Sequence, residues 1–465
     1  MSSPPAAPAA FQEGLMPAST TVQPILSFRS PGLKLLVIIF LTLVMTFPLI
    51  LVFAVLSERE SRRNEAERNI ADGWGHQQSV SGPFLLVPYT VATTVTVSGQ
   101  QSEQLVTRYA VFLPQSLTSD AELKTETRAR GIFAIPVYSA TITLSGQFSG
   151  LDAKLLANAR EVRWSEAFVA IGISGLNAIQ AQAELVTAGG TAKAPFQPGI
   201  GFAQGITGIH APIALSGPAA AFDFSVSLSL RGTRSMRFTP AGATTEARIA
   251  GDWPHPSFQG AYLPAEREVS PQGFSARWSV PNLARSLPSV WTAEVPALDD
   301  ASNWAFGVDL YSPVDFYQLV GRALKYGIMF VGSAFLAFYL IELITGARVH
   351  AVQYLMIGAA QIIFYLLLLG IAEHWGFDRA YALASATTIA VTGIYAMTAF
   401  RSTLRGFVVD GIMAALYGLL YLLLAEEDYA LLIGSVALLV MLVTTMFVTR
   451  KVDWYETAPT ASKSG

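Results

Sequence analysis

The stretch GDWPHPSFQGAYLP at 251–264 holds the residues whose types and spacing come nearest to a catalytic pair. Asp252 and His255 stand three positions apart, and a carboxylate can orient an imidazole that acts as a general base. The two prolines favour a structural interpretation, because each fixes its own φ and disfavours helical geometry at the residue before it. No nucleophile is singled out among the many serines. We therefore interpret the stretch as a stiff extended corner between strands, and keep a minority hypothesis of a binding site at Asp252, Trp253 and His255.

Ionisable residues within or beside apolar segments form a second set of candidates, because a charge in lipid is costly and often functional. Glu342 and Asp410 lie near the inner ends of their segments, where Arg348, Arg401 and Arg405 could pair with them. We favour an interfacial ion network that holds the helices together over a transport role. The other members of this candidate membrane-interface polar network are expected at the outer surface: Arg322, Lys325, Glu373 and His374.

Metal and cofactor chemistry find little support in the sequence. The chain has no cysteine, which excludes disulfides, thiol catalysis and Cys-based metal sites. A histidine-based site would need a coincidence of tertiary structure, because the expected topology scatters the five histidines, at 76, 210, 255, 350 and 374. There is no GxSxG, HExxH or Walker motif, and no GxGxxG between a strand and a helix. We expect a protein that is not an enzyme and carries no metal or cofactor.

The composition points to a membrane protein. Of the 465 residues, 52% are hydrophobic and only 14% are charged, whereas a soluble domain has roughly 25% charged residues. The net charge of −3 gives no indication of a nucleic-acid partner, which usually requires a basic face.

Six apolar segments are long enough to cross a membrane, since spanning its apolar core takes roughly 20 helical residues. The first is too long for a cleaved signal peptide and is followed by a charged stretch, so we interpret it as an uncleaved anchor. The other five cluster near the C-terminus. The segments are 33–56, 327–345, 352–372, 380–400, 407–425 and 429–449.

Positive charges in the short loops predict the orientation. Arg348, Arg401 and Arg405 lie in alternate loops, and Arg450 and Lys451 follow the last segment, so these parts are expected in the cytoplasm. Six crossings then place the N-terminus in the cytoplasm as well. The large insert between the first and second segments is expected in the periplasm.

The insert is expected to be rich in β-strands. FDFSVSLSLRG at 222–232 alternates apolar and polar residues, which is typical of a strand with one buried face. LDAKLLANAREVRWSEAF at 151–168 is the one stretch there with a helical pattern. We predict an α + β membrane protein with one N-terminal anchor helix, an antiparallel β-sandwich-like domain, either two fused sandwiches or one with very long strands, and a C-terminal five-helix bundle.

The predicted boundaries follow from these patterns. The parts are a flexible cytoplasmic tail at 1–32, the anchor helix at 33–56, a β-rich domain with a helical stalk at 57–325, five transmembrane helices at 326–450 and a cytoplasmic tail at 451–465.

Long ordered segments resemble the CreD family of bacterial inner-membrane proteins, over roughly 30–456. They include GPFLLVP at 82–88, the stretch 251–278 and DFYQLVGRALKYGIMF at 315–330, with further similarity at 347–377 and 447–455. The resemblance implies a role in cell-envelope integrity, linked to a two-component system of the same name and to tolerance of colicins and β-lactams. It implies no reaction and no catalytic residue.

Two functions remain open. The first is an envelope-integrity or stress-response protein that binds an envelope protein or a glycan through its periplasmic domain, without catalysis. The alternative is a small transporter or flippase-like protein with a periplasmic receptor domain, for which Gln361, Glu342 and Asp410 would matter most. Membrane lipids are expected partners in both, and both are compatible with a homo-oligomer. A periplasmic hydrolase using Asp252 and His255 is a third, weaker hypothesis.

Overall fold

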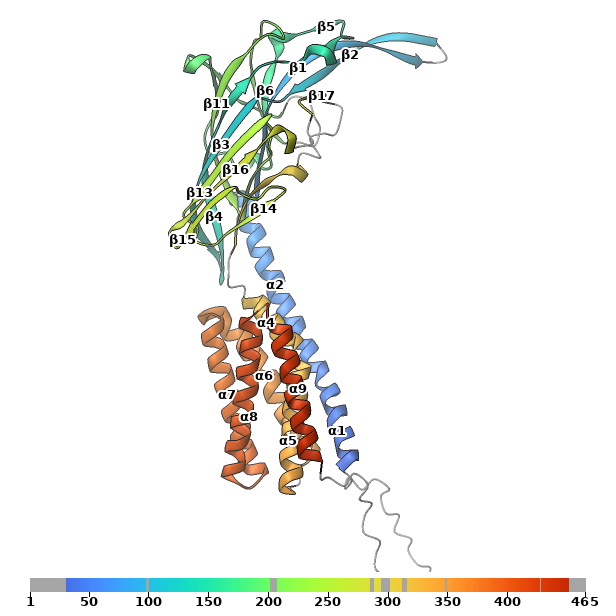
Figure 1. Cartoon of the computed structure of the whole chain (residues 1–465), viewed down its shortest axis with the longest axis vertical. Coiled ribbons are helices and arrows are strands. Elements are labelled where there is room, and N and C mark those ends of the chain that lie inside the picture. The colour runs from blue at the N-terminus through green and yellow to red at the C-terminus, as the bar shows by residue number, and fades with distance from the viewer. Residues whose placement is uncertain are drawn as a thin grey trace, which may run out of the picture. The chain divides into compact units, whose positions relative to one another are not determined.

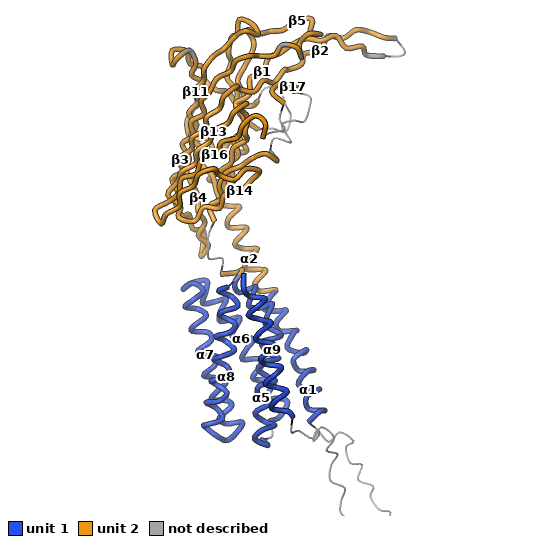
Figure 2. Tube along the Cα trace, viewed as in Figure 1, with its two compact units in different colours: residues 1–53, 319–465 blue, residues 54–318 orange. Residues whose placement is uncertain are grey.

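The chain divides into two compact units, which Figure 2 shows in different colours. The helical unit takes its residues from 1–53 and 319–465, and the β-rich unit is made of 54–318. The β-rich unit is therefore an insertion within the sequence of the helical unit. The computed structural model describes residues 31–97, 100–200, 207–284, 288–293, 302–311, 316–347, 349–426 and 428–450.

Some sequence-based expectations lie outside these described ranges. They concern the tails at 1–30 and 451–465, and Arg348.

The helices of the chain lie mainly in the helical unit (Figure 1). With α1 and α2 taken as one, six of them are long and apolar enough to cross a membrane. The six predicted apolar segments are thus helical, and with the β-rich insert they confirm the predicted α + β fold class. The described helices are α1 Pro31–Val44, α2 Thr46–Trp74, α4 Phe316–Lys325, α5 Gly327–Thr345, α6 Ala351–Trp375, α7 Phe377–Ala399, α8 Thr403–Ala425 and α9 Ala430–Thr449.

Aromatic side chains fill the space between α5, α6, α7 and α8. The Tyr417 ring centroid lies 4.7 Å from those of Phe330 and Phe364, and the Tyr381 hydroxyl donates to the Tyr417 carbonyl oxygen over 2.6 Å. Lipid tails are as apolar as these side chains, so packing and interhelical hydrogen bonds hold such helices together. None of the residues of α9 is buried, so α9 lies at the edge of the unit.

The β-rich unit consists of two sheets. The ten-stranded sheet contains β1 Gln78–Val97, β2 Gln100–Phe112, β5 Glu161–Val162, β6 Phe168–Ile173, β9 Gln197–Pro198, β10 Gly208–Pro212, β12 Ser235–Phe238, β14 Pro256–Gly260, β17 Val290–Thr292 and β18 Phe306–Leu310. The eight-stranded sheet contains β3 Ser116–Arg130, β4 Phe133–Phe148, β7 Glu184–Thr187, β8 Ala192–Pro195, β11 Phe222–Thr233, β13 Thr244–Gly251, β15 Glu266–Ser270 and β16 Gly273–Val280.

The two sheets share one hydrophobic core, so the unit is one sandwich with long strands rather than two fused ones. Strand β11 shows how the sequence pattern builds this core: Val226, Leu228 and Leu230 are buried, and the serines between them are not. Most neighbouring strands are antiparallel, as predicted. Two pairs differ, because β1 pairs with β12 and β3 pairs with β13 in parallel.

The helix predicted over 151–168 is wrong. These residues form a 3₁₀ turn at Ala153–Leu156, the short strand β5 and a second 3₁₀ turn at Trp164–Glu166. The backbone amides of Arg160 and Arg163 donate to carbonyl oxygens of β1 instead of to a helix. Pairing with a neighbouring strand thus outweighs the local helix propensity, which is only a few tenths of a kcal/mol per residue.

Trp74 joins the end of α2 to the sandwich. The guanidinium carbons of Arg128 and Arg231 lie 4.4 Å and 4.2 Å from its ring centroid, and its indole N–H donates to the Tyr138 carbonyl oxygen over 3.2 Å. The next residue, Gly75, has φ 135°, and a Cβ there would lie 2.7 Å from the Arg231 carbonyl oxygen. Only glycine therefore allows the chain to leave the helix this close to β11.

Tyr138 lies in the core of the sandwich beside this junction. Its hydroxyl donates to the Ser235 carbonyl oxygen over 2.6 Å, and burial raises its pKa well above its ordinary value of 10. The hydroxyl therefore remains a neutral donor at any physiological pH.

Candidate functional site

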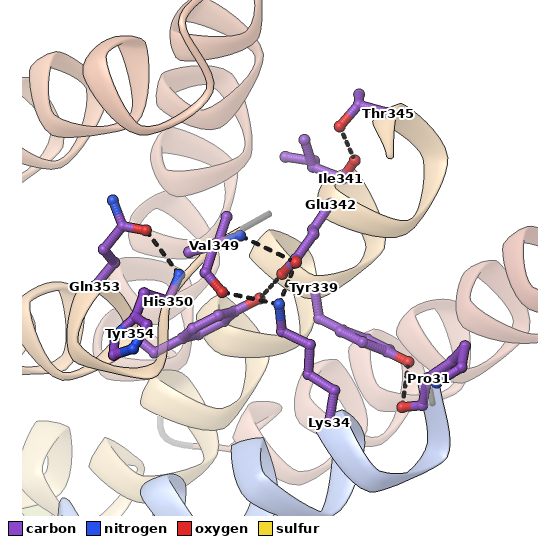
Figure 3. Close-up of polar contacts among 10 residues, drawn as sticks. All are labelled: Pro31, Lys34, Tyr339, Ile341, Glu342, Thr345, Val349, His350, Gln353 and Tyr354. Carbon is purple, nitrogen blue, oxygen red and sulfur yellow. Dashed lines mark hydrogen bonds and ion pairs between the residues drawn. The ribbon is translucent and has the colours of Figure 1, made fainter. Parts of the chain in front are cut away.

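A buried carboxylate is the centre of a polar network in the helical unit (Figure 3). Glu342, from α5, is only 7% exposed. Its Oε1 atom accepts from the Lys34 ammonium group of α1 and, over 3.1 Å, from the Val349 backbone amide. Its Oε2 atom accepts from the Tyr354 hydroxyl of α6 over 2.9 Å. We call these four residues the Glu342 network.

The Glu342 network connects three helices and one loop. Lys34 also donates to the Val349 carbonyl oxygen over 2.8 Å, so its charge has two acceptors. Both carboxylate oxygens of Glu342 are satisfied, which offsets the cost of removing the charge from water. The arrangement is that of a clamp, because each partner comes from a different part of the chain.

Further hydrogen bonds position Tyr354 and the start of α1, where Lys34 lies. The start of α6 has a capping box, in which His350 Nδ1 accepts from the Val352 amide and the Gln353 side chain accepts from the His350 amide. This cap sets where α6 begins and so where Tyr354 stands, one turn later. The Tyr339 hydroxyl donates to the Pro31 carbonyl oxygen over 2.9 Å, next to Lys34 at the start of α1.

The structure corrects the partners predicted for Glu342. Glu342 pairs with Lys34, and no ion pair joins it to Arg401 or Arg405 in the described structure. Arg405 instead donates to the Phe400 carbonyl oxygen over 3.4 Å. The predicted partners were arginines of the inner loops, whereas Lys34 lies in the first turn of α1, 308 positions before Glu342. Arg348 lies outside the described residues.

Asp410 does not belong to the Glu342 network. Its carboxylate packs against Gly393 of α7 so closely that a Cβ there would overlap it. The Oδ1 atom is buried and has no hydrogen-bond partner among the described residues. Asp410 thus requires a glycine opposite it, but the described residues supply no cation to pair with it.

The predicted outer members lie on α4 and in the last turn of α6. Arg322 of α4 donates to the Leu424 carbonyl oxygen in the last turn of α8, where a cation is favoured by the helix dipole. Lys325 and His374 are exposed, and Glu373 is half-buried. A polar network of these four residues at the outer surface stays a prediction.

The corner at Asp252 joins β13 to β14 and forms hydrogen bonds with β3 and with Tyr311, directly after β18. Asp252 Oδ1 accepts from the backbone amide and hydroxyl of Thr125 in β3, over 2.7 Å and 2.6 Å. The Trp253 indole N–H donates to the Tyr311 carbonyl oxygen over 2.8 Å, and the Tyr311 amide donates to the His255 carbonyl oxygen. No hydrogen bond or ion pair joins Asp252 to His255 in the described structure, and neither side chain is buried. Asp252 is used to hold β3 to the corner.

Among the residues that the structure describes, no three His, Asp or Glu side chains lie close enough together to hold a metal ion.

Comparison with known proteins agrees with this architecture. The family model for the inner membrane protein CreD matches residues 30–455, which include both units. The chain belongs to the CreD family. The inner membrane protein CreD of Escherichia coli (strain K12) is 32% identical over 428 residues, covering 89% of this chain and 91% of that protein. The predicted membership and the inner-membrane character are confirmed.

In this CreD family member, sequence reasoning missed Lys34 and Tyr354 as parts of a site. A signal for Lys34 existed, because a charge in the first turn of an apolar segment needs a partner or a route to the surface. Tyr354 gave no such signal, since tyrosine is common near membrane surfaces.

We predict that Glu342→Ala lowers the free energy of unfolding by about 3 kcal/mol, because it leaves the Lys34 charge without its partner. Unfolding of the full chain by sodium dodecyl sulfate from detergent micelles would measure this. Glu426→Ala is the matched control, since Glu426 is an exposed carboxylate at the end of α8. Lys34→Met combined with Glu342→Gln should recover most of the loss. Equal stabilities of the two alanine variants would contradict a clamp.

We further predict that Asp252→Ala lowers the free energy of unfolding by about 1–2 kcal/mol, because the Thr125 amide loses its hydrogen-bond acceptor. His255→Ala should change stability by less than about 0.5 kcal/mol, as is usual for an exposed side chain. Hydrogen exchange at β3 in the full chain would detect the difference. A His255→Ala protein that is stable but inactive in the cell would instead favour a binding site at the corner.

Proposed function

We propose that this CreD family member contributes to cell-envelope integrity or the envelope stress response through a binding role of its β-rich unit, without catalysis. The observation that carries the proposal concerns the two carboxylates with the strongest sequence case for chemistry. Both carboxylate oxygens of Glu342 accept hydrogen bonds, from Lys34, Val349 and Tyr354. The Asp252 carboxylate accepts hydrogen bonds from Thr125. Groups used in this way hold a fold rather than turn over a substrate.

We also propose that both termini lie in the cytoplasm and that residues 57–325 lie in the periplasm. Figure 1 shows the first turn of α1, the α7–α8 connection and the end of α9 at the same end of the helical unit. These parts carry Lys34, Arg401, Arg405 and Arg450. Such a collection of basic residues in short segments favours the cytoplasmic side.

The absence of cysteine from the sequence makes this orientation directly testable. Single cysteines at the exposed positions Gln272, Thr403 and Asp428 would report on the β-rich unit and on opposite ends of the helical unit. With a membrane-impermeant maleimide and a permeabilised outer membrane, Gln272→Cys and Asp428→Cys should be labelled in intact cells. Thr403→Cys should react only after lysis. The parent protein is the unlabelled control, and the reverse pattern would overturn the orientation.

One observation favours the alternative of a small transporter or flippase-like protein. Gln361 in α6 is fully buried, and neither its amide oxygen nor its amide nitrogen has a hydrogen-bond partner among the described residues. An unsatisfied amide is expensive in an apolar interior, and such polar groups often mark a pathway.

Gln361→Leu separates the two functions. If the helical unit is an anchor, removing an unsatisfied amide should leave stability unchanged or raise it by about 1 kcal/mol. The variant and the parent protein should then restore detergent resistance equally to a strain that lacks the protein. If the unit transports a substrate, Gln361→Leu should fold and insert but fail to restore resistance. An unchanged envelope in the strain without the protein would count against the proposed function itself.

A further inference from the structure

A row of polar side chains follows one face of α7, a helix that is long and apolar enough to cross a membrane. Its members recur every three or four positions, so they lie within a narrow arc of the helix surface. They are Asp378, Tyr381, Ser385, Thr388 and Thr392. A second row on α8, spaced by seven and four positions, consists of Asp410, Tyr417 and Tyr421. We call these eight residues the α7–α8 seam.

The two rows of the seam face each other, since α7 and α8 pack side by side (Figure 1). At one end the Tyr421 hydroxyl donates to Asp378 Oδ1 over 3.1 Å. At the other end the Asp410 carboxylate packs against Gly393 of α7. Between these ends the Tyr381 hydroxyl donates to a backbone carbonyl oxygen of α8 over 2.6 Å. The seam therefore connects one carboxylate to another.

The seam covers most of the thickness of a bilayer. From 378 to 393 the helix rises by about 22 Å, at 1.5 Å per residue, and the apolar core of a bilayer is about 30 Å thick. Neighbouring polar groups in the α7 row are separated by a rise of about 4.5–6 Å. One water molecule with two hydrogen bonds of about 2.8 Å spans such a gap.

Two oxygen atoms at the Asp410 end need a partner from outside the protein. Thr392, only 2% exposed, has a buried hydroxyl without a hydrogen-bond partner in the part of the chain that the structure describes. The same holds for Asp410 Oδ1. An unpaired group of this kind costs roughly 1–3 kcal/mol in an apolar interior. Water satisfies both atoms, because it donates and accepts hydrogen bonds.

Asp410 differs from the other buried carboxylate of the helical unit in having no cation. Glu342 is paired with Lys34. No ion pair joins Asp410 to Arg401 or Arg405 among the described residues, and Arg405 donates to a backbone carbonyl oxygen instead. A carboxylate that holds an ammonium group is a fixed part of the fold. A carboxylate in a membrane helix without a cation is free to exchange a proton, as in proton relays.

The ends of the seam are accessible and its middle is not. Asp378 is exposed and Asp410 is half-buried, whereas Tyr381, Thr388 and Tyr417 between them are buried. Hydroxyl groups both donate and accept hydrogen bonds, so they can pass a proton on. The carboxylates at the ends can take up and release it.

We propose that the α7–α8 seam conducts protons through the helical unit. Asp410 exchanges a proton with one side of the membrane and Asp378 with the other. The hydroxyl groups of Thr392, Thr388 and Tyr417, with water molecules bound between them, pass the proton along. At each step one O–H bond forms as another breaks, so a proton gradient is the only driving force needed. This activity belongs to the helical unit and does not rest on the binding role proposed for the β-rich unit.

The test is proton entry into vesicles that contain the full-length protein. Purified protein would be reconstituted in phosphatidylcholine vesicles, and an outward potassium gradient with valinomycin would drive protons inward. Pyranine inside the vesicles would report the internal pH. We expect vesicles with the parent protein to acidify faster than vesicles without protein.

Asp410→Asn should lower the protein-dependent rate at least about tenfold, because an amide does not take up and release a proton as a carboxylate does. Glu426→Gln is the matched control, since it makes the same change in an exposed carboxylate at the end of α8. The control should conduct as the parent does.

A tyrosine pair tests the middle of the seam. Tyr417→Phe keeps the ring that packs on Phe330 and Phe364 and removes only the hydroxyl, so it should fold and still slow proton entry. Tyr429→Phe is its control, because Tyr429 is an exposed tyrosine at the start of α9. Unfolding in sodium dodecyl sulfate would confirm that each variant is folded, and the tyrosine pair decides the test if Asp410→Asn does not fold.

Acidification by the parent protein at the rate of protein-free vesicles would overturn the proposal. So would equal rates for Asp410→Asn and Glu426→Gln, or for Tyr417→Phe and Tyr429→Phe, because either result would take the protons off the seam.

Discussion

A carboxylate buried inside an apolar helical unit must be matched, and the matching of Glu342 is the constraint on which this architecture depends. Its partners come from α1, from the loop after α5 and from α6. Because Lys34 is among them, the first helix is held in the same unit as helices that follow about 300 residues later. Residues 54–318 are consequently an insertion in the sequence of the helical unit, and not a domain joined to it at one end.

The β-rich unit is stabilised in a different way. Without cysteine, no disulfide can brace it, so its stability must come from packing and backbone pairing. Long strands such as β1, β3 and β4 serve this purpose, since each buries alternate side chains in a core shared by both sheets. Trp74, under the guanidinium groups of Arg128 and Arg231, then fixes the end of α2 to the sandwich. The polar face of α2 is left to line a cleft.

The Glu342 network and this cleft therefore differ in kind. In the Glu342 network the charges are enclosed and matched by the chain itself, which suits a fixed anchor. In the cleft, charges of both signs line an open site beside one face of α2. Under the function proposed above, the β-rich unit is the binding part and the helices hold the protein in the inner membrane.

The sequence by itself determined the features that depend on local pattern. Runs of about twenty apolar residues identified the membrane helices, and the alternation at 222–232 identified a half-buried strand, because helix and strand periods are properties of neighbouring residues. The 151–168 segment was mispredicted because strand β1, some 70 residues earlier, supplies its hydrogen-bond partners. Likewise, Glu342 could be recognised as a buried charge, but only the tertiary structure decided that Lys34 matches it and that Asp410 stands apart. Burial makes a partner necessary, and which partner is available depends on how distant helices pack, which no local pattern records.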